Sequence, residues 1–503
     1  MSLTTDQNKL FRSDAQHRQE AIRVARAEAL QKVGDPIHVP TKPLRVLIKQ
    51  REGKEPDAFV AESGFVLRRI GLQSGKTKQV YRGHCGPVTS LDFFATKTAR
   101  RELLISGSWD KSFRVWDIQT KTCISTTVAH MDFIKTVLVI PELDALVTGS
   151  SDKDLRIWDL SSLDSFDYST LSSSASSTTT TTNSEQPEVK SGGGGAAPPS
   201  AISNNPLPLF SSLKSHTRPI ERLAYFPITT STPPKEGDGE SEKTGKIGLV
   251  STDSMGVLKI WELEKVNGTN GRATVKGIER SSVRHHELAI YDLVVGSEAG
   301  EIWTASADNS ILLSSFSSSS PSSPPIPILR IPHPTQTRAL LPLHLSYPNF
   351  PYLLTTTTTP EELIRIFDLN SESLEPDEKR ELRREWKGIA VVPSKQVNGG
   401  TTGTEVSLEG CLREVEGHTN EIVSLATYVV ENDNEGEEEK SRRREVWILS
   451  ASLDGTLRRW NWKEMLENKR DKLVLVEVNE EEEKESLLTE EEERELEELM
   501  MED

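Results

Sequence analysis

Three segments of the chain superpose on one another without gaps: Leu103–Ile118, Leu146–Leu160 and Trp447–Trp462. Each has two short apolar runs separated by a tight turn that contains an aspartate, a pattern that predicts a hairpin of largely buried strands. Trp116 and Trp158 are 42 residues apart, a spacing that accommodates four short strands per unit. A period near forty residues indicates a repeat protein, in which neighbouring units bury a continuous core between them.

Weaker copies of the same pattern fill the rest of the chain. They are Phe59–His84 with Ile70 at the tryptophan position, Leu249–Leu263 with Trp261, Ile302–Phe316 with Ser314, and Tyr352–Leu369 with Phe367. Pro43–Gln50 supplies an apolar strand ahead of the first of these copies. Three strong and four degenerate units give a total of seven.

The units resemble WD repeats. Trp116-Asp117 and Trp158-Asp159 supply the dipeptide itself, and His84 and His418 each follow a glycine, as in the Gly-His that opens such a repeat. The resemblance implies an all-β fold, a seven-bladed WD40 β-propeller. No specific member of the family is identified.

The expected organisation has three parts. Residues 1–40 form an N-terminal extension with an amphipathic helix over Ser13–Val33, residues 41–476 form the propeller, and residues 477–503 form an acidic tail. We also expect Lys472–Val478 to form the outer strand of the last blade.

The resemblance further implies a buried hydrogen-bonded relay in each well-formed unit. In the family, a histidine before the innermost strand, a hydroxyl on the second strand, an aspartate in the turn and a tryptophan on the third strand are joined. Carried onto this chain, the complete sets are His84, Ser106, Asp110 and Trp116; His130, Thr148, Asp152 and Trp158; and His418, Ser450, Asp454 and Trp460. Because a buried carboxylate and an indole N–H both need partners, we interpret these residues as structural and not catalytic.

Two units depart from the relay pattern. Met255 stands at the turn-aspartate position of the unit that contains His216, Ser251 and Trp261, and Asp253 comes two residues early. His286 and Asp308 have no tryptophan partner. We expect these blades to be less rigid.

The long insertions all fall in loops of one class. In a WD propeller the d–a and b–c loops lie on the narrower top face, and the a–b and c–d loops lie on the bottom face. Here the c–d insertions are 161–208, 315–327 and 370–410, and the a–b insertions are 229–246 and 431–444. Their polar, low-complexity composition predicts disorder.

The short top loops make the top face the candidate for partner binding, because a pre-organised surface loses little entropy on binding. The opposite hypothesis, that insertions mark the binding face, stays open. Repeat position selects seven candidate partner-binding residues: Thr89, Trp109, Phe133, Lys135, Glu221, Tyr291 and Arg338. The two aromatic side chains are either interface hot spots or packing contacts with a neighbouring blade.

Composition narrows the function classes. The net charge is −17, but residues 477–503 hold 15 acidic and 2 basic residues, a net of −13, which leaves −4 for the rest. A nearly balanced body argues against nucleic-acid binding. Three cysteines predict neither a disulfide framework nor a zinc site, and no run of about 18 apolar residues predicts a membrane span. We expect a cytoplasmic or nuclear protein, since no secretory or mitochondrial leader is recognised.

No phosphate-binding glycine loop, metal-ligand spacing or nucleophile elbow is found, so we expect no catalysis and no cofactor. The expected function is a scaffold that binds partner proteins or peptides. One alternative is a substrate-recognition adaptor of a ubiquitin ligase, which Gln119 and Ser161 disfavour because such adaptors carry arginine two residues after Trp-Asp. Another is a chaperone-like binder of basic proteins through the acidic tail.

Overall fold

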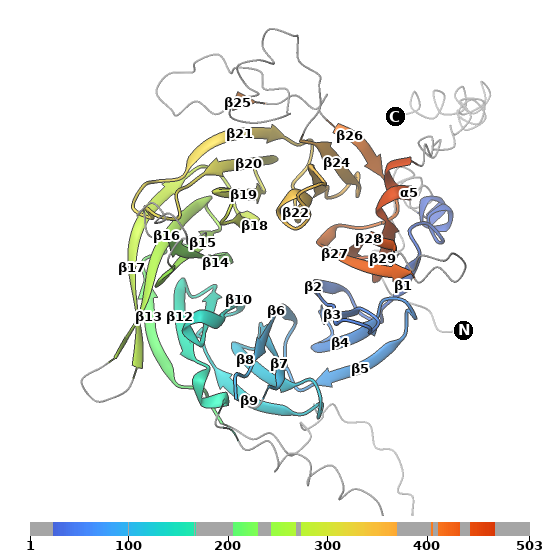
Figure 1. The fold of residues 1–503 in the computed structure, drawn as a ribbon. Helices are drawn as coiled ribbons and strands as arrows, with labels where there is room; N and C mark the ends of the chain where they lie inside the picture. The colour runs from blue at the N-terminus through green and yellow to red at the C-terminus, as the bar shows by residue number, and fades with distance from the viewer. Residues whose placement is uncertain are drawn as a thin grey trace, which may run out of the picture. The chain divides into compact units, whose positions relative to one another are not determined.

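The computed structural model describes residues 24–98, 100–164, 166, 205–229, 243–267, 273–369, 404–405, 411–432 and 443–467. Leu30–Trp462 form one compact unit of seven sheets arranged around a common centre (Figure 1), so the expected seven-bladed propeller is confirmed. The second unit, Met1–Ala29 with Lys463–Asp503, is described only over residues 24–29, which are helical, and over the end of helix α5 (Trp462–Glu467).

Each blade is an antiparallel sheet whose first strand lies nearest the centre of the ring (Figure 1). Blade 1 holds β2 (Pro43–Lys49), β3 (Asp57–Glu62), β4 (Val66–Gly71) and β5 (Thr77–Arg82); blade 2 holds β6 (Val88–Ala95), β7 (Glu102–Ser108), β8 (Ser112–Asp117) and β9 (Cys123–Val128). Blade 3 holds β10 (Ile134–Ile140), β11 (Ala145–Ser150), β12 (Asp154–Asp159) and β13 (Leu209–Lys214); blade 4 holds β14 (Ile220–Thr229), β15 (Lys243–Asp253), β16 (Val257–Asn267) and β17 (Ala273–Arg284).

Blades 5 to 7 have the same arrangement, except that blade 5 has a fifth strand and blade 7 takes its outer strand from the N-terminal part of the chain. Blade 5 holds β18 (Ile290–Gly296), β19 (Glu301–Ser306), β20 (Ser310–Ser315) and β21 (Ile326–Pro332), with β25 (Thr404–Glu405) parallel to β21; blade 6 holds β22 (Leu340–Pro342), β23 (Tyr352–Thr356), β24 (Ile364–Asp368) and β26 (Cys411–Val415). Blade 7 holds β27 (Ile422–Asn432), β28 (Arg443–Ser452), β29 (Thr456–Asn461) and β1 (Pro36–His38). Short 3-10 turns occur at η1 (Pro141–Leu143), η2 (Ser161–Leu163) and η4 (Leu343–Leu345).

The ring is closed by the N-terminal strand β1, which pairs antiparallel with β29 from Pro36↔Arg458 to His38↔Thr456. This differs from our expectation in two ways. Residues that we assigned to the N-terminal extension occupy the outer position of blade 7, and the segment that we expected there, 472–478, lies outside the described residues. Pairing the first strand with the last blade joins distant parts of the chain and completes blade 7 to four strands.

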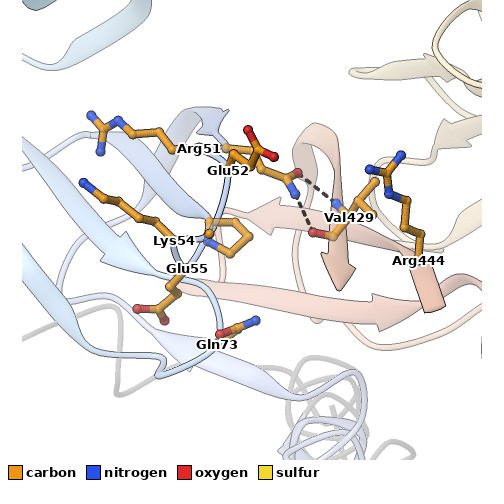
Figure 2. Close-up of a pocket in the computed structure, with 10 residues that line it drawn as sticks. Arg51, Glu52, Lys54, Glu55, Gln73, Val429 and Arg444 are labelled. Atoms are coloured by element: carbon orange, nitrogen blue, oxygen red, sulfur yellow. Dashed lines mark hydrogen bonds between the residues drawn. The ribbon is translucent and has the colours of Figure 1, made fainter. Parts of the chain in front are cut away.

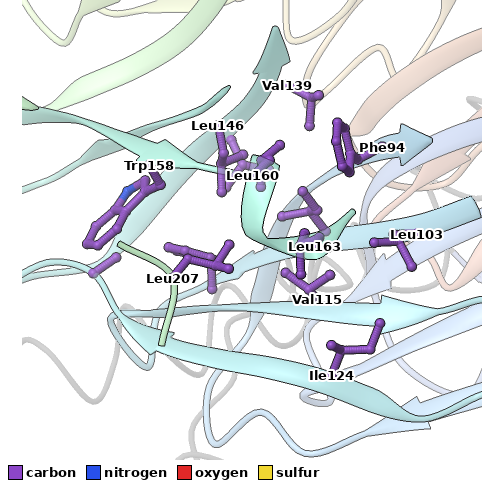
Figure 3. Close-up of a cluster of buried hydrophobic side chains, with 14 of the residues drawn as sticks. Phe94, Leu103, Val115, Ile124, Val139, Leu146, Trp158, Leu160, Leu163 and Leu207 are labelled. Atoms are coloured by element: carbon purple, nitrogen blue, oxygen red, sulfur yellow. The ribbon is translucent and has the colours of Figure 1, made fainter. Parts of the chain in front are cut away.

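The hydrophobic core lies between neighbouring blades. Between blades 2 and 3, Val115 and Phe94 meet Val139, Leu146 and Trp158 in one buried cluster (Figure 3). The same cluster includes Leu163 and Leu207, two buried leucines that lie near the two ends of the insertion 161–208 (Figure 3). Both ends of this insertion are therefore anchored in the core.

The positions of the insertions follow the expected loop classes. The strands β12 and β13, β20 and β21, and β24 and β26 flank the three c–d insertions, and β14–β15 and β27–β28 flank the a–b insertions. Apart from 315–327, strand β25 and a few residues at their ends, the insertions lie outside the described residues.

One insertion differs from the expectation of disorder. Residues 316–325 form turns, because Phe316 is buried and packs edge-to-face on Phe226 with ring centroids 4.7 Å apart. Its backbone N–H also donates to the carbonyl oxygen of Gly300 at 2.9 Å.

Candidate functional site

The structure brings together each of the three complete relay sets. In blade 2, His84 Nε2 lies 2.8 Å from Ser106 Oγ, and His84 Nδ1 lies 2.8 Å from an oxygen of Asp110. The Trp116 indole N–H donates to Ser106 Oγ at 2.9 Å. The corresponding distances in blade 3 (His130, Thr148, Asp152, Trp158) and blade 7 (His418, Ser450, Asp454, Trp460) lie between 2.7 and 3.0 Å.

The direction of the hydrogen bonds follows from the donors present. Indole N–H can only donate, so Ser106 Oγ accepts it, and the serine hydroxyl is free to donate to His84 Nε2. His84 Nδ1 then carries the hydrogen that reaches Asp110. The chain of donors therefore requires a neutral imidazole and an ionised carboxylate.

Burial supports the same protonation states. Burial lowers the pKa of His84 and of His418, although the facing aspartates act in the opposite direction. Burial would raise the pKa of Asp110, but its hydrogen bonds with His84 and Ser112 hold it well below the usual range. These groups are hydrogen-bonded to one another, so their arrangement holds the strands and the turn of the blade together.

Blade 4 contains a fourth relay that the sequence reading did not complete. His216 Nε2 lies 2.7 Å from Ser251 Oγ, which also accepts the Trp261 indole N–H at 2.8 Å. The carboxylate comes from Asp253, 3.3 Å from His216 Nδ1, and not from the turn position held by Met255. Asp253 also accepts the backbone N–H groups of Met255 and Val257, which tie it to the turn. A carboxylate two residues earlier thus reaches the same imidazole.

The remaining relays are shorter. In blade 5, His286 contacts Asp308 at 2.9 Å and Thr304 at 2.8 Å, but Ser314 stands where the tryptophan would be. In blade 6, His333 Nδ1 donates to the carbonyl oxygen of Thr335 at 2.9 Å. Burial lowers the pKa of His333 to about 4.

Trp109 and Phe133 meet on the top face, although they belong to different blades. Trp109 lies in the b–c turn of blade 2, and Phe133 ends the loop that leads into β10 of blade 3. Their rings stack with centroids 5.0 Å apart and planes 18° apart, and 41% and 40% of the two residues remain exposed. The two side chains are therefore in a packing contact between neighbouring blades. They also form an exposed apolar platform that a partner could contact, so the two alternatives considered from the sequence, packing and binding, are compatible.

The other candidate residues also lie along the top ends of the innermost strands. Lys135 Nζ is 2.8 Å from a carboxylate oxygen of Glu221, which links blades 3 and 4. The guanidinium of Arg338 lies 3.8 Å from the ring centre of Tyr291 and 3.4 Å from Glu421. Thr89 is engaged internally, because its hydroxyl donates to the carbonyl oxygen of Ile134 at 2.7 Å.

Sequence reasoning missed Glu421, although the signal was present. The candidate positions were those three and five residues after a relay histidine, and Glu421 stands three residues after His418. Arg45 in β2 was also missed, because blade 1 has no relay histidine from which to count.

The bottom face contains a polar cavity of about 570 Å³ between blades 1 and 7 (Figure 2). The side-chain amide of Gln50 bridges this boundary by donating to the carbonyl oxygen of Val429 and accepting its N–H at 3.0 Å (Figure 2). Glu55 is bound by Lys78 and by the backbone N–H of Ser74, and although burial opposes them, these contacts lower its pKa to about 2. These polar groups satisfy one another, so the cavity is a weaker candidate site than the top face.

Within the described part of the chain, no group of three or more histidine, cysteine, aspartate or glutamate side chains is placed to hold a metal ion. Over the same residues, no helix has the length and apolar character needed to cross a membrane.

Comparison with known families identifies the repeats. The model of the WD domain, G-beta repeat matches residues 75–117, 121–159 and 409–461. Each match runs from the outer strand of one blade through the first three strands of the next, for example from β5 to β8. This offset of one strand is the reason that blade 7 needs β1 to complete it.

Comparison with curated proteins gives relatives, two of which have WD repeats in their names. An uncharacterized WD repeat-containing protein of Schizosaccharomyces pombe is 22% identical over 55% of this chain and 59% of its own length. A periodic tryptophan protein 2 homolog of the same organism is 38% identical over 13% of this chain and 7% of its own length. An F-box/WD-40 repeat-containing protein of Arabidopsis thaliana is 39% identical over 13% of this chain and 11% of its own length. The chain therefore spans less than two thirds of each of these relatives.

Proposed function

We propose that this chain, in which the WD-repeat model matches three segments and whose strands form a seven-bladed propeller, is a non-catalytic scaffold that binds partner proteins or peptides on its top face. The observation that carries the proposal is the exposed stack of Trp109 on Phe133. Aromatic side chains dominate the binding energy of protein interfaces, and a stack that is already formed loses little entropy on binding. The relay histidines and aspartates are hydrogen-bonded within their blades, which supports a role without catalysis.

The proposal is tested by affinity purification with the full chain and the double variant Trp109→Ala/Phe133→Ala. A matched control, Leu209→Ala/Ile326→Ala, removes two exposed apolar side chains from the starts of the outer strands β13 and β21, which lie at the bottom face. We expect a set of partners to be lost with the first variant and retained with the second. Loss with the control alone would assign binding to the bottom face, and unchanged partners with a folded first variant would refute the proposal.

The acidic tail favours a second candidate function. Its net charge of −13 over residues 477–503 suits a chaperone-like binder of basic proteins, whose binding would weaken with salt. Full-length protein and a version ending at Glu477 should be compared for binding to a basic protein such as lysozyme at two salt concentrations. Equal binding by both proteins at low salt would eliminate this function.

The ubiquitin-ligase adaptor remains the third candidate and has weaker support. One relative has F-box in its name, but its similarity to this chain covers 13% of the residues. The positions two residues after Trp-Asp hold Gln119 and Ser161, whose backbone N–H groups donate to Asp117 and Asp159. Copurification of a cullin with the wild-type chain would support the adaptor function.

A further inference from the structure

Three arginine side chains surround the top mouth of the central channel. Arg45 and Arg222 are each the third residue of an innermost strand, β2 and β14, so they lie at the same height in blades 1 and 4. Arg338 precedes β22 of blade 6. The innermost strands ring the centre of the propeller (Figure 1), and Arg45 and Arg222, from blades 1 and 4, both reach Asp292 of blade 5. Arg338 lies over the ring of Tyr291, the residue next to Asp292, and 3.4 Å from Glu421.

One carboxylate serves two of these arginines. An oxygen of Asp292, in β18 of blade 5, lies 3.3 Å from Arg45 Nη1 and 3.7 Å from Arg222 Nε. The other oxygen accepts the backbone N–H of Leu340 at 2.9 Å. Asp292 is therefore fully engaged, and its side chain is only 5% exposed.

The arginines have more donors than the site has acceptors. A guanidinium offers five N–H donors, and Arg222 uses one of them on the carbonyl oxygen of Glu221 at 3.0 Å. Its buried Nε has no hydrogen-bond acceptor among the described residues. The side chains of Arg45, Arg222 and Arg338 remain 28%, 23% and 31% exposed, so all three are partly accessible to solvent. Burial lowers the pKa of Arg222 to about 10, which reflects a cation that has lost water without gaining a full partner set.

The neighbouring acidic groups are already occupied. Glu221 pairs with Lys135 at 2.8 Å, and Glu421 pairs with Arg338 at 3.4 Å. Asp92, which faces Arg45 from blade 2, accepts the backbone N–H groups of its neighbour Phe93 and of Val139. With Asp92 included, four basic and four acidic groups meet here, so the site has no excess of net charge. What it lacks is acceptor oxygens for the arginines.

We infer that the top mouth of the channel receives an anionic side chain, a carboxylate or a phosphoryl group, carried by a partner segment that also packs on the Trp109–Phe133 platform. The inference rests on the proposed function and names the chemistry of the partner. An oxyanion offers several acceptor atoms and pairs bidentately with guanidinium groups. A lysine or arginine from the partner would instead compete with Lys135 and the three arginines for carboxylates that are already paired. Lys135 lies two residues after Phe133, so the platform and the charged mouth form a continuous surface.

The test uses immobilised full chain and four fluorescein-labelled peptide pools. Each pool has randomised flanks and one fixed central residue: glutamate, phosphoserine, serine or lysine. We expect the glutamate or the phosphoserine pool to be retained about tenfold more than the serine pool, as charge-assisted hydrogen bonds would give. The lysine pool should be retained least. Comparison of the glutamate and phosphoserine pools shows which oxyanion is preferred.

The double variant Arg45→Gln/Arg222→Gln should remove the preference for the anionic pools. The control Arg82→Gln/Arg218→Gln removes two exposed arginines that lie next to top-face loops outside the channel, and it should keep the preference. Thermal unfolding shows whether each variant is folded. If the channel variant does not fold, competition on the wild type replaces it: sodium sulfate should displace the anionic pools more than sodium chloride of equal ionic strength.

Two results would overturn the inference: equal retention of the anionic and serine pools by the wild type, or a preference that survives in the folded channel variant. Equal displacement by sulfate and chloride would do the same. These outcomes are separate from the proposed function, because partners lost with Trp109→Ala/Phe133→Ala would still identify the top face as the binding surface.

Discussion

The indole nitrogen of Trp116 lies 2.9 Å from the hydroxyl oxygen of Ser106, which also contacts His84 at 2.8 Å. One buried hydroxyl therefore serves two partners. Ser106→Ala leaves the indole N–H and the imidazole Nε2 without a partner, and each orphaned buried group costs about 1–3 kcal/mol. We expect the free energy of unfolding, measured with urea, to fall by at least about 2 kcal/mol.

Thr148 performs the same function in blade 3, so Ser106→Thr is the matched control for this prediction. It retains the hydroxyl and should be clearly more stable than Ser106→Ala. Equal loss in both variants would mean that side-chain volume, and not hydrogen bonding, matters at this position.

The blade 4 relay predicts different roles for Asp253 and Met255. Asp253 joins His216 to the turn, so Asp253→Ala should destabilise the protein by about 2 kcal/mol, because it removes a charge-assisted bond and the acceptor for two backbone N–H groups. Met255→Ala should change stability by less than about 0.5 kcal/mol, as for a substitution away from the relay. Urea unfolding of the two variants measures this. A larger loss for Met255→Ala would show that the turn position matters more than the relay.

The protonation of the relays predicts loss of stability in acid. Burial lowers the folded-state pKa of His84 and His418 below 6.5, and that of His333 to about 4. Below pH 6.5 the unfolded chain therefore binds more protons than the native state, and stability falls as pH falls. His333 alone accounts for up to about 3 kcal/mol by pH 4, before any relaxation of the structure.

The aspartates add to this trend and one group opposes it. The lowered pKa values of Asp110 and Asp454 remove further stability as pH drops through and below their ordinary value of 3.8. Burial raises the pKa of Asp92 to about 6, so this group favours the folded state as pH falls from 6 towards 3.8. Melting temperatures at pH 7.5, 6.5, 5.5 and 4.5 should decrease in that order. A melting temperature that rises from pH 6.5 to 5.5 would contradict neutral relay histidines.

Ring closure through β1 gives a prediction that the repeats alone did not. Ile37 is buried against blade 7, whereas the next residue, His38, points outward. Ile37→Ala should cost about 2–4 kcal/mol, as for other buried aliphatic side chains, and His38→Ala should cost little. Similar urea midpoints for both variants would show that β1 contributes nothing to closure.

The repeated strands could be predicted from the sequence, whereas residues that depart from the repeat pattern could not. The spacing from Trp116 to Trp158 reports a repeat, and the strands of blades 2, 3 and 7 follow from it because each hairpin buries its own apolar runs. Asp253 was not recognised as a relay member because the family pattern fixes one turn position, whereas a flexible hairpin can supply the carboxylate from another.

Long-range pairs leave no local pattern. Arg45 and Asp292 are 247 positions apart and meet only because blades 1 and 5 face the same channel. The pairing of Pro36 with Arg458 likewise depends on closure of the ring, which cannot be predicted from the sequence of either segment alone. Such contacts follow from the number of blades and not from the sequence of any one of them.

The turn of blade 4 provides a last prediction, because Gly256 has no room for a side chain. Its φ is +76°, and a Cβ there would lie 2.1 Å from the carbonyl oxygen of His286, in the loop that leads to blade 5. Gly53 has a similar φ of +66°, but a Cβ there would meet nothing within 4 Å. Both substitutions to alanine carry the cost of a left-handed backbone, about 1–2 kcal/mol.

Only Gly256→Ala adds a clash with backbone, and relieving it requires His286 to move away from Asp308. We therefore expect Gly256→Ala to be less stable than Gly53→Ala by at least about 2 kcal/mol in urea unfolding. The displaced loop also leads into β18, which carries Tyr291 and Asp292 at the channel mouth. Folded Gly256→Ala should therefore bind top-face partners more weakly than Gly53→Ala does, and equal binding would show that the mouth is insensitive to this loop.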